Sequence, residues 1–321
     1  MTCYNEGAYI GTAVRSVLAQ TWAEVIDRIV IADDGSRADT IAVLNDIAQW
    51  DPRIHVIYGL GGAGLPTQRN LAIRATQSPL IAILDGDDVW SEDKLERQLP
   101  AMNDPQIGLV YSKYYTFSDS LDDAHGARVR DITKGGNLTH AYFLNDPPII
   151  PSTTLIRRAA FDACDGFDPA VRVFEDTDFY LRLSRVCRFS FVDSPVLYKR
   201  YHPSSITGGR KDLMAHHAYV ALKAAAMDPS LLSLVPRRLA ERARKLGNHH
   251  FLLGQLDDAR QMIRFAVRLD PLNLRAWTSW LVTGRLASLV NVMMSSRWRK
   301  RRAAIGALRQ PSALDLESAA R

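Results

Sequence analysis

Residues 80–99 constrain the fold of this chain more than any other stretch. The apolar run Leu80–Leu84 leads directly into Asp85-Gly86-Asp87-Asp88, and a helix-like segment follows from Ser91 to Leu99. Such a run predicts a buried strand, and open α/β sheets bind ligands at the carboxyl ends of their strands. Because clustered carboxylates repel one another, we expect positive charge among them, most simply a divalent cation that also holds substrate phosphates. The alternative is a solvated acidic turn that caps the next helix.

The first two hundred residues alternate strand and helix signals. This alternation predicts an α/β fold, with a mainly parallel mixed sheet flanked by helices. Expected helices span 7–20, 38–50, 66–76 and 175–186, and expected strands span 28–32, 53–58, 80–84, 107–116, 149–156 and 188–198. Residues 117–140 are polar and predict a loop.

Composition limits the class of protein. A hydrophobic content of 47% in 321 residues is enough for a packed core. The three cysteines have no zinc-site spacing and indicate a reducing, cytoplasmic setting. Residues 1–209 carry 20 Lys+Arg against 27 Asp+Glu, whereas residues 210–321 carry 20 against 8. The acidic front half argues against a nucleic-acid partner, and the basic back half suits an anionic surface such as the inner face of a membrane.

The sequence changes character after Gly208-Gly209. We expect a catalytic domain over 1–208, a helical region over 209–310 and a disordered tail over 311–321. Residues 246–279 follow a tetratricopeptide-like helix-pair pattern once, although solenoids need about three such units, so a helical appendage is favoured. Residues 284–309 combine a Met/Leu face with a basic cluster around Trp298. That pattern is typical of a peripheral membrane helix and equally of a core-packed helix with a solvated basic end.

A second acidic turn, Asp33-Asp34-Gly35-Ser36, follows another strand-like run, so both turns should lie at one edge of a parallel sheet. Five motifs, taken together, resemble glycosyltransferase family 2, which has the GT-A, Rossmann-like fold of nucleotide-diphospho-sugar transferases. In chain order they are Thr2-Cys3-Tyr4-Asn5-Glu6, Ser16–Thr21, Asp33-Asp34-Gly35-Ser36, Arg69-Asn70 and Asp85-Gly86-Asp87-Asp88.

The resemblance implies roles for individual residues. Thr2, Tyr4 and Glu6 would contact the nucleotide, Asp34 would bond the base, and Arg69 would help to hold the nucleotide. Asp85-Gly86-Asp87 would be the metal motif (DxD), with Asp87 as the direct ligand of Mn²⁺ or Mg²⁺ and Asp85 serving ribose or metal. Asp88 is expected to cap a helix or support the ligands.

Transfer with inversion also needs a general base for the acceptor hydroxyl. The segment Glu175-Asp176 resembles the family's Glu-Asp motif, which makes Asp176 the expected base and Glu175 its orienting neighbour. These acids could instead simply complement a helix N-terminus. By the same resemblance His202 could ligate the metal or contact the diphosphate, and Lys199 or Arg200 could neutralise the leaving group. A surface histidine with basic neighbours is the alternative.

The resemblance predicts a metal-dependent inverting glycosyltransferase in surface polysaccharide or lipid-linked glycan synthesis. Its donor would be a nucleotide-sugar, with UDP first among the nucleotides, and its acceptor a glycan or a lipid-linked saccharide. The second hypothesis is a degenerate, non-catalytic relative that binds nucleotide-sugar or serves as a scaffold. A nucleotidyltransferase is a third hypothesis, but it would need a basic Gly-rich phosphate loop near the N-terminus, which this sequence lacks. A nicotinamide-dependent oxidoreductase, suggested by Gly59–Gly64, would leave both acidic turns unexplained.

The start of the chain departs from the family pattern. Family members begin with an apolar strand ahead of the Thr-x-Tyr-Asn segment, and here Met1 stands where that strand should end. Without it, neighbouring strands would expose apolar surface and unpaired backbone. We expect the natural chain to begin upstream of Met1.

Overall fold

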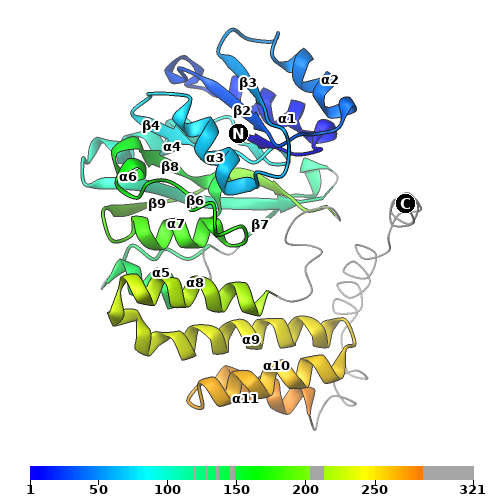
Figure 1. The fold of residues 1–321 in the computed structure, drawn as a ribbon, viewed down its shortest axis with the longest axis vertical. Coiled ribbons are helices and arrows are strands. Elements are labelled where there is room, and N and C mark those ends of the chain that lie inside the picture. The colour runs from blue at the N-terminus through cyan, green and yellow to red at the C-terminus, as the bar shows by residue number, and fades with distance from the viewer. Residues whose placement is uncertain (119, 128, 135–136, 145–148, 203–212, 285–321) are drawn as a thin grey trace. The chain divides into compact units, whose positions relative to one another are not determined.

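The structure is a computed structural model that describes residues 1–118, 120–127, 129–134, 137–144, 149–202 and 213–284 (Figure 1). The chain divides into two compact units, Met1–Tyr201 and His202–Arg321. The boundary lies close to the one expected from the sequence change after residue 208.

A parallel three-stranded sheet, in the order β1-β2-β3, opens the first unit. Its strands are β1 (Thr2–Cys3), β2 (Ile29–Asp33) and β3 (Ile54–Tyr58). Every residue of β2 is buried, because helices cover both of its faces. Ile29 and Ile31 pack in one core cluster with residues of α1 (Gly7–Leu18) and α2 (Ala38–Ile47). Val30 and Ala32 pack with Ala72 of α3 (Leu65–Arg74).

The two acidic turns lie at the same edge of this unit, as the sequence predicts. Cys3 pairs in parallel with Asp33, and Thr2 forms a parallel bridge with Asp85. The backbone of Thr2 and Cys3 therefore joins the end of β2 to the turn that follows β4 (Leu80–Ala82).

A second, six-stranded sheet mixes parallel and antiparallel pairs. Its path is β4-β8-β6-β9-β5, and β7 pairs with β6. Only β6 and β9 run parallel, and the other pairs are antiparallel, so the mainly parallel arrangement holds for the first sheet alone. The remaining strands are β5 (Val89–Trp90), β6 (Ile107–Phe117), β7 (His125–Gly126), β8 (Leu155–Arg157) and β9 (Arg188–Arg200).

The remaining helices of this unit are short. They are α4 (Lys94–Gln98), α5 (Leu138–Leu144), α6 (Arg158–Ala163) and α7 (Glu175–Leu183), with 3-10 turns η1 (Ala23–Val25), η2 (Leu99–Asn103), η3 (Leu121–Asp123) and η4 (Pro151–Thr153). The segment 117–140, expected to be a loop, contains η3, β7 and the start of α5. The strand expected over 149–156 is shorter, because the backbone turns through η4 before β8 begins.

An apolar groove of about 510 Å³ lies between β2 and β4. Ile29 and Val30 line one side of it, and Leu80, Ala82 and Leu84 line the other. Met1 also lines the groove, and its amino group donates to the carbonyl of Val30 at 2.7 Å. That an upstream apolar strand precedes Met1 stays a prediction.

The second unit is helical where it is described. It consists of α8 (Met214–Met227), η5 (Pro229–Leu234), α9 (Val235–Leu252), α10 (Leu256–Leu269) and α11 (Leu274–Thr283). Small residues such as Ala240, Ala243, Ala266 and Ala276 form the core of these helices, which brings their backbones close together. The predicted helix pair near 246–279 falls on the end of α9, on α10 and on the start of α11.

The amphipathic candidate over 284–309 lies outside the described residues except for Gly284, and the predicted tail over 311–321 lies wholly outside them. Among the helices that the structure describes, none combines the length and the apolar character needed to cross a bilayer.

Candidate active site

The turn at 85–88 is fixed by its backbone. The Asp85 amide donates to Ser152 Oγ at 3.1 Å, and the Asp88 amide donates to the Asp85 carbonyl at 3.1 Å. A side chain would not fit at Gly86, because a Cβ there would lie 2.2 Å from Glu6 Oε2 and 3.0 Å from the Thr2 carbonyl. The glycine therefore lets the carboxylate of Glu6 approach the turn.

The half-buried Glu6 and the buried Asp88 each have a carboxylate oxygen at this turn that lacks a partner. Glu6 Oε2 and Asp88 Oδ2 are both buried and make no hydrogen bond. Burial, together with the nearby Asp87 and Asp85, raises the pKa of Glu6 to about 9. Burial also raises the pKa of Asp88 to about 7. Unsatisfied buried acceptors cost free energy, so this cluster is suited to a positively charged or donating ligand.

Positive groups of the chain already approach the acidic turn. Asp88 raises the pKa of Lys199 above its ordinary value, despite the opposing effect of burial. The Arg200 amide donates to Asp88 Oδ1 at 3.0 Å, and Arg200 Nε donates to the Asp87 carbonyl at 3.2 Å. The Arg200 guanidinium also lies 4.4 Å from the ring centre of Phe117. The end of β9 is thus held against the turn.

Arg69 lies between the acidic turn and α7. Its Nη2 is 2.6 Å from Asp85 Oδ1, and its Nη1 is 2.6 Å from Glu175 Oε1. Burial works to raise the pKa of Asp85, but the charges of Arg69 and Lys199 outweigh it and hold that pKa below its ordinary value. Two of the predicted site segments therefore meet through one guanidinium.

The Glu175-Asp176 pair begins α7. Phe174, the residue before the helix, has φ 63°, a left-handed conformation that is uncommon outside glycine. Burial raises the pKa of Glu175 to about 7, against the opposing charge of Arg69, and burial also raises the pKa of Asp176. Asp176 Oδ1 accepts from the Thr177 amide at 2.6 Å. A raised carboxylate pKa suits a group that must take up a proton.

The remaining predicted residues of the first unit line the same edge of the sheet or lie close to it. Thr2 pairs with Ala32 of β2 and forms a bridge to Asp85 in the turn, and Tyr4 is 60% exposed. Asp34 is engaged within the protein: its oxygens accept from the Ala63 amide at 3.0 Å, the Gly64 amide at 2.9 Å and Gln68 Nε2 at 2.9 Å. Asp34 thus anchors the Gly-rich loop. His202 begins the second unit, so its predicted role in the site stays untested.

The donor atoms at this turn fit a hard divalent cation. Carboxylate oxygens are the ligands that Mg²⁺ and Mn²⁺ take, and the turn offers them beside two buried oxygens that lack partners. Among the described residues, no three His, Cys, Asp or Glu side chains already form a metal-binding group.

Two features of the site have no clear signal in the sequence. Ser152 supports the Asp85 amide from a segment 67 residues away, and nothing in its local sequence marks it. The two-sided engagement of Arg69 depends on α7, which begins 106 residues further on. Both are tertiary contacts, which motif spacing does not encode.

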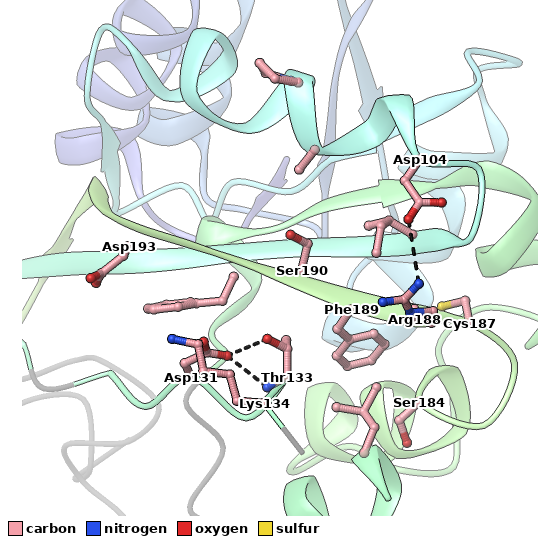
Figure 2. Close-up of a pocket in the computed structure, with 15 residues that line it drawn as sticks. Asp104, Asp131, Thr133, Lys134, Ser184, Cys187, Arg188, Phe189, Ser190 and Asp193 are labelled. Atoms are coloured by element: carbon pink, nitrogen blue, oxygen red, sulfur yellow. Dashed lines mark hydrogen bonds and ion pairs between the residues drawn. The ribbon is translucent and has the colours of Figure 1, made fainter. Parts of the chain in front are cut away.

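A cavity of about 770 Å³ lies elsewhere in the first unit, and no predicted site residue lines it. Figure 2 shows its charged lining residues. Asp131 accepts from the Thr133 amide at 2.9 Å, and Arg188 lies 3.8 Å from Asp104. Because none of the predicted site residues lines it, this cavity is not part of the candidate site.

The comparisons with known proteins identify the family of this chain. Residues 1–164, half of the chain, match the family described as Glycosyl transferase family 2. The chain is 35% identical over 174 residues to the Escherichia coli UDP-Glc:alpha-D-GlcNAc-diphosphoundecaprenol beta-1,3-glucosyltransferase WfaP, which covers 53% of this chain and 66% of that protein. Alignments with two relatives from Bacillus subtilis and Haemophilus influenzae span 43% and 60% of their lengths.

Two solved structures have a similar fold at low sequence identity. Staphylococcus aureus TarS 1-349 in complex with UDP-GlcNAc has a TM-score of 0.60 at 16% identity, over 91% of this chain and 90% of that one. The mannosyltransferase PcManGT from Pyrobaculum calidifontis, in complex with GDP-Man and Mn²⁺, has a TM-score of 0.61 at 16% identity, over 96% and 83%. The predicted GT-A fold is confirmed.

Proposed function

Because this chain belongs to glycosyl transferase family 2, we propose that it moves a sugar from a nucleotide-diphospho-sugar to an acceptor hydroxyl with inversion at the anomeric carbon. One observation carries the proposal. The carboxylate turn at 85–88 and the Glu175-Asp176 pair meet across a single buried arginine, so the groups that we assign to donor binding and to proton acceptance would share one site.

We assign the donor to the sheet edge. Thr2, Glu6 and Asp85 lie at that edge, and the exposed ring of Tyr4 is available to a nucleotide. Asp34 would contribute through the loop that it anchors, with its hydrogen bonds rearranged toward a base. A UDP-sugar is favoured because TarS was solved with UDP-GlcNAc and the E. coli relative is named for UDP-Glc.

Asp87 and Asp85 would hold a divalent cation, Mn²⁺ or Mg²⁺, and His202 is a third candidate ligand. When bound, such a cation neutralises charge on the departing diphosphate. Lys199, whose charge already lies near Asp88, would add to that neutralisation from the protein itself.

Asp176 is assigned as the general base. The acceptor oxygen bonds to the anomeric carbon from the face opposite the diphosphate, and its proton passes to the Asp176 carboxylate. The bond between the anomeric carbon and the diphosphate oxygen breaks, and its electron pair leaves with the nucleoside diphosphate. Glu175, held by Arg69, orients this end of α7.

We propose a glycan or lipid-linked saccharide as the acceptor, in surface polysaccharide synthesis at the inner face of the membrane. The E. coli relative is named for a diphosphoundecaprenol-linked acceptor. The surplus of basic residues after residue 209 suits an anionic lipid surface.

The test is release of nucleoside diphosphate from UDP-glucose, UDP-GlcNAc and GDP-mannose, with and without Mn²⁺. Asp87→Asn and Asp176→Asn should each lower kcat by about 10² or more, since a general base or a charge-stabilising group contributes that much. Asp257→Asn, at a fully exposed carboxylate, is the matched control and should leave turnover unchanged.

Two results would contradict the proposal. Wild-type turnover that survives both substitutions would exclude this site as the place of the chemistry. Donor binding in a thermal-shift panel without any turnover would favour the non-catalytic alternative, because a ligand stabilises the folded state whether or not it reacts.

A further inference from the structure

Arg69 is enclosed by the groups that it contacts. Its side chain is 3% exposed, and both terminal nitrogens are engaged, one with Asp85 and one with Glu175, at 2.6 Å each. The ring of Phe167 covers it, with its centre 5.5 Å from the guanidinium carbon. A nucleotide that enters the site would therefore meet the two carboxylates before it met the arginine.

The two carboxylates come from opposite sides of the proposed reaction. Asp85 belongs to the turn assigned to the donor, and Glu175 is the first residue of α7 and the neighbour of the assigned base. They are separated by 90 positions in the sequence, and α3 supplies the arginine that joins them. A guanidinium is planar and rigid, so its two terminal nitrogens fix the spacing of two acceptors, which a single ammonium group does not.

Electrostatics support the same assignment. Asp85 and Glu175 raise the pKa of Arg69 against the effect of burial, so the arginine stays charged. Its charge opposes the effect of burial on the pKa of Asp176 as well as on that of Glu175. Without the arginine, Asp85 would still have Lys199 as an opposite charge, but Glu175 and Asp176 would lose theirs.

We propose that Arg69 is a positioning residue, which sets the distance between the donor-binding turn at 85–88 and the Glu175-Asp176 end of α7. It acts through these carboxylates and not, as the family resemblance implies, by contact with the nucleotide. The proposal rests on the proposed function, since it concerns the two halves of that site.

The test compares Arg69→Lys and Arg69→Met with Arg74→Met. Arg74 is on the same helix, and its ion pair with Asp165 is exposed, so its loss should change kcat by less than about twofold. Both Arg69 variants should lower kcat with UDP-glucose or UDP-GlcNAc by about 10². The donor KM should change by less than about threefold. In a further variant, Arg69→Ala, free guanidinium at millimolar concentration should partly restore kcat.

A second readout does not depend on turnover. Amide hydrogen exchange over residues 177–180 should be faster in Arg69→Lys than in the wild type, and unchanged in Arg74→Met. The exchange measurement uses Arg69→Lys, so it can be made even if Arg69→Met fails to fold.

Two outcomes would overturn the positioning role, and a third concerns the proposed function. A rise in donor KM at constant kcat would make Arg69 a nucleotide contact and would overturn the positioning role. Unchanged exchange at the start of α7 in Arg69→Lys would overturn it as well. Absence of wild-type turnover with every donor would count against the proposed function, and the exchange result would still decide the role of Arg69.

Discussion

At the scale of single residues, the interior of the first unit contains a buried lysine that the proposed chemistry does not use. Lys94 is 0% exposed, and its Nζ donates to Gln98 Oε1 and to the Thr154 carbonyl. Its ammonium lies 4.7 Å from the ring centre of Trp90. Burial lowers the pKa of Lys94 to about 7, so a proton at this site favours the unfolded chain.

The pH dependence of stability should show this lysine. Between about pH 7 and the unfolded pKa, the unfolded state binds more protons than the folded state, so the free energy of unfolding should rise with pH. The rise in the free energy of unfolding should amount to a few kcal/mol, because it follows from the difference between the pKa of Lys94 in the unfolded and in the folded chain. Denaturant unfolding from pH 7 to pH 10 measures it. Lys94→Met should lessen the slope, whereas Lys134→Met, at an 86% exposed side chain, should keep it. Parallel curves for wild type and Lys94→Met would contradict the assignment.

At the scale of elements, the packing of α9 on α10 depends on one glycine. A Cβ at Gly247 would lie 2.6 Å from Ile263 Cγ1 and 3.0 Å from the Ala259 carbonyl. A glycine inside a helix costs about 1 kcal/mol relative to alanine, so close contact between the helices must offset that cost.

Gly247→Val should therefore destabilise the second unit by about 2 kcal/mol or more, since overpacking costs about 1–3 kcal/mol and valine adds little helix propensity. Thermal unfolding measures the change. His249→Val, at an exposed position two residues further along the same helix, controls for propensity. Equal midpoints for both variants would show that the two helices do not meet at Gly247.

At the scale of the whole molecule, the chain separates into two units, and every described residue of the proposed site except His202 belongs to the first. We predict that a fragment of residues 1–201 folds alone and binds UDP. Its thermal midpoint should rise by a few degrees in UDP at about 100 times Kd. Circular dichroism and thermal shift on the purified fragment test this. A fragment that does not fold would contradict the first part of the prediction. A folded fragment that does not bind UDP, while the full chain binds it, would assign part of the donor site to the second unit.

The sequence by itself determined the class of fold, and it supplied the chemical groups of the proposed site. A short apolar run predicted β2, and helical spacing of apolar residues predicted α1, each within a few residues of its observed bounds. The two acidic turns were predicted to share an edge, and the parallel pairing of Thr2 and Cys3 confirms this.

Only the tertiary structure decided how those groups engage one another. The mixed second sheet, the support of Asp85 by Ser152 and the engagement of Asp34 with its loop depend on contacts between distant segments. Arg69 is the clearest case. The sequence motif predicts a role for it in the site, and the fold places its guanidinium between two carboxylates that lie 90 positions apart in the sequence. Local propensity acts over a few residues, whereas burial and charge pairing act between neighbours in space, so the sequence names the groups and the fold selects their partners.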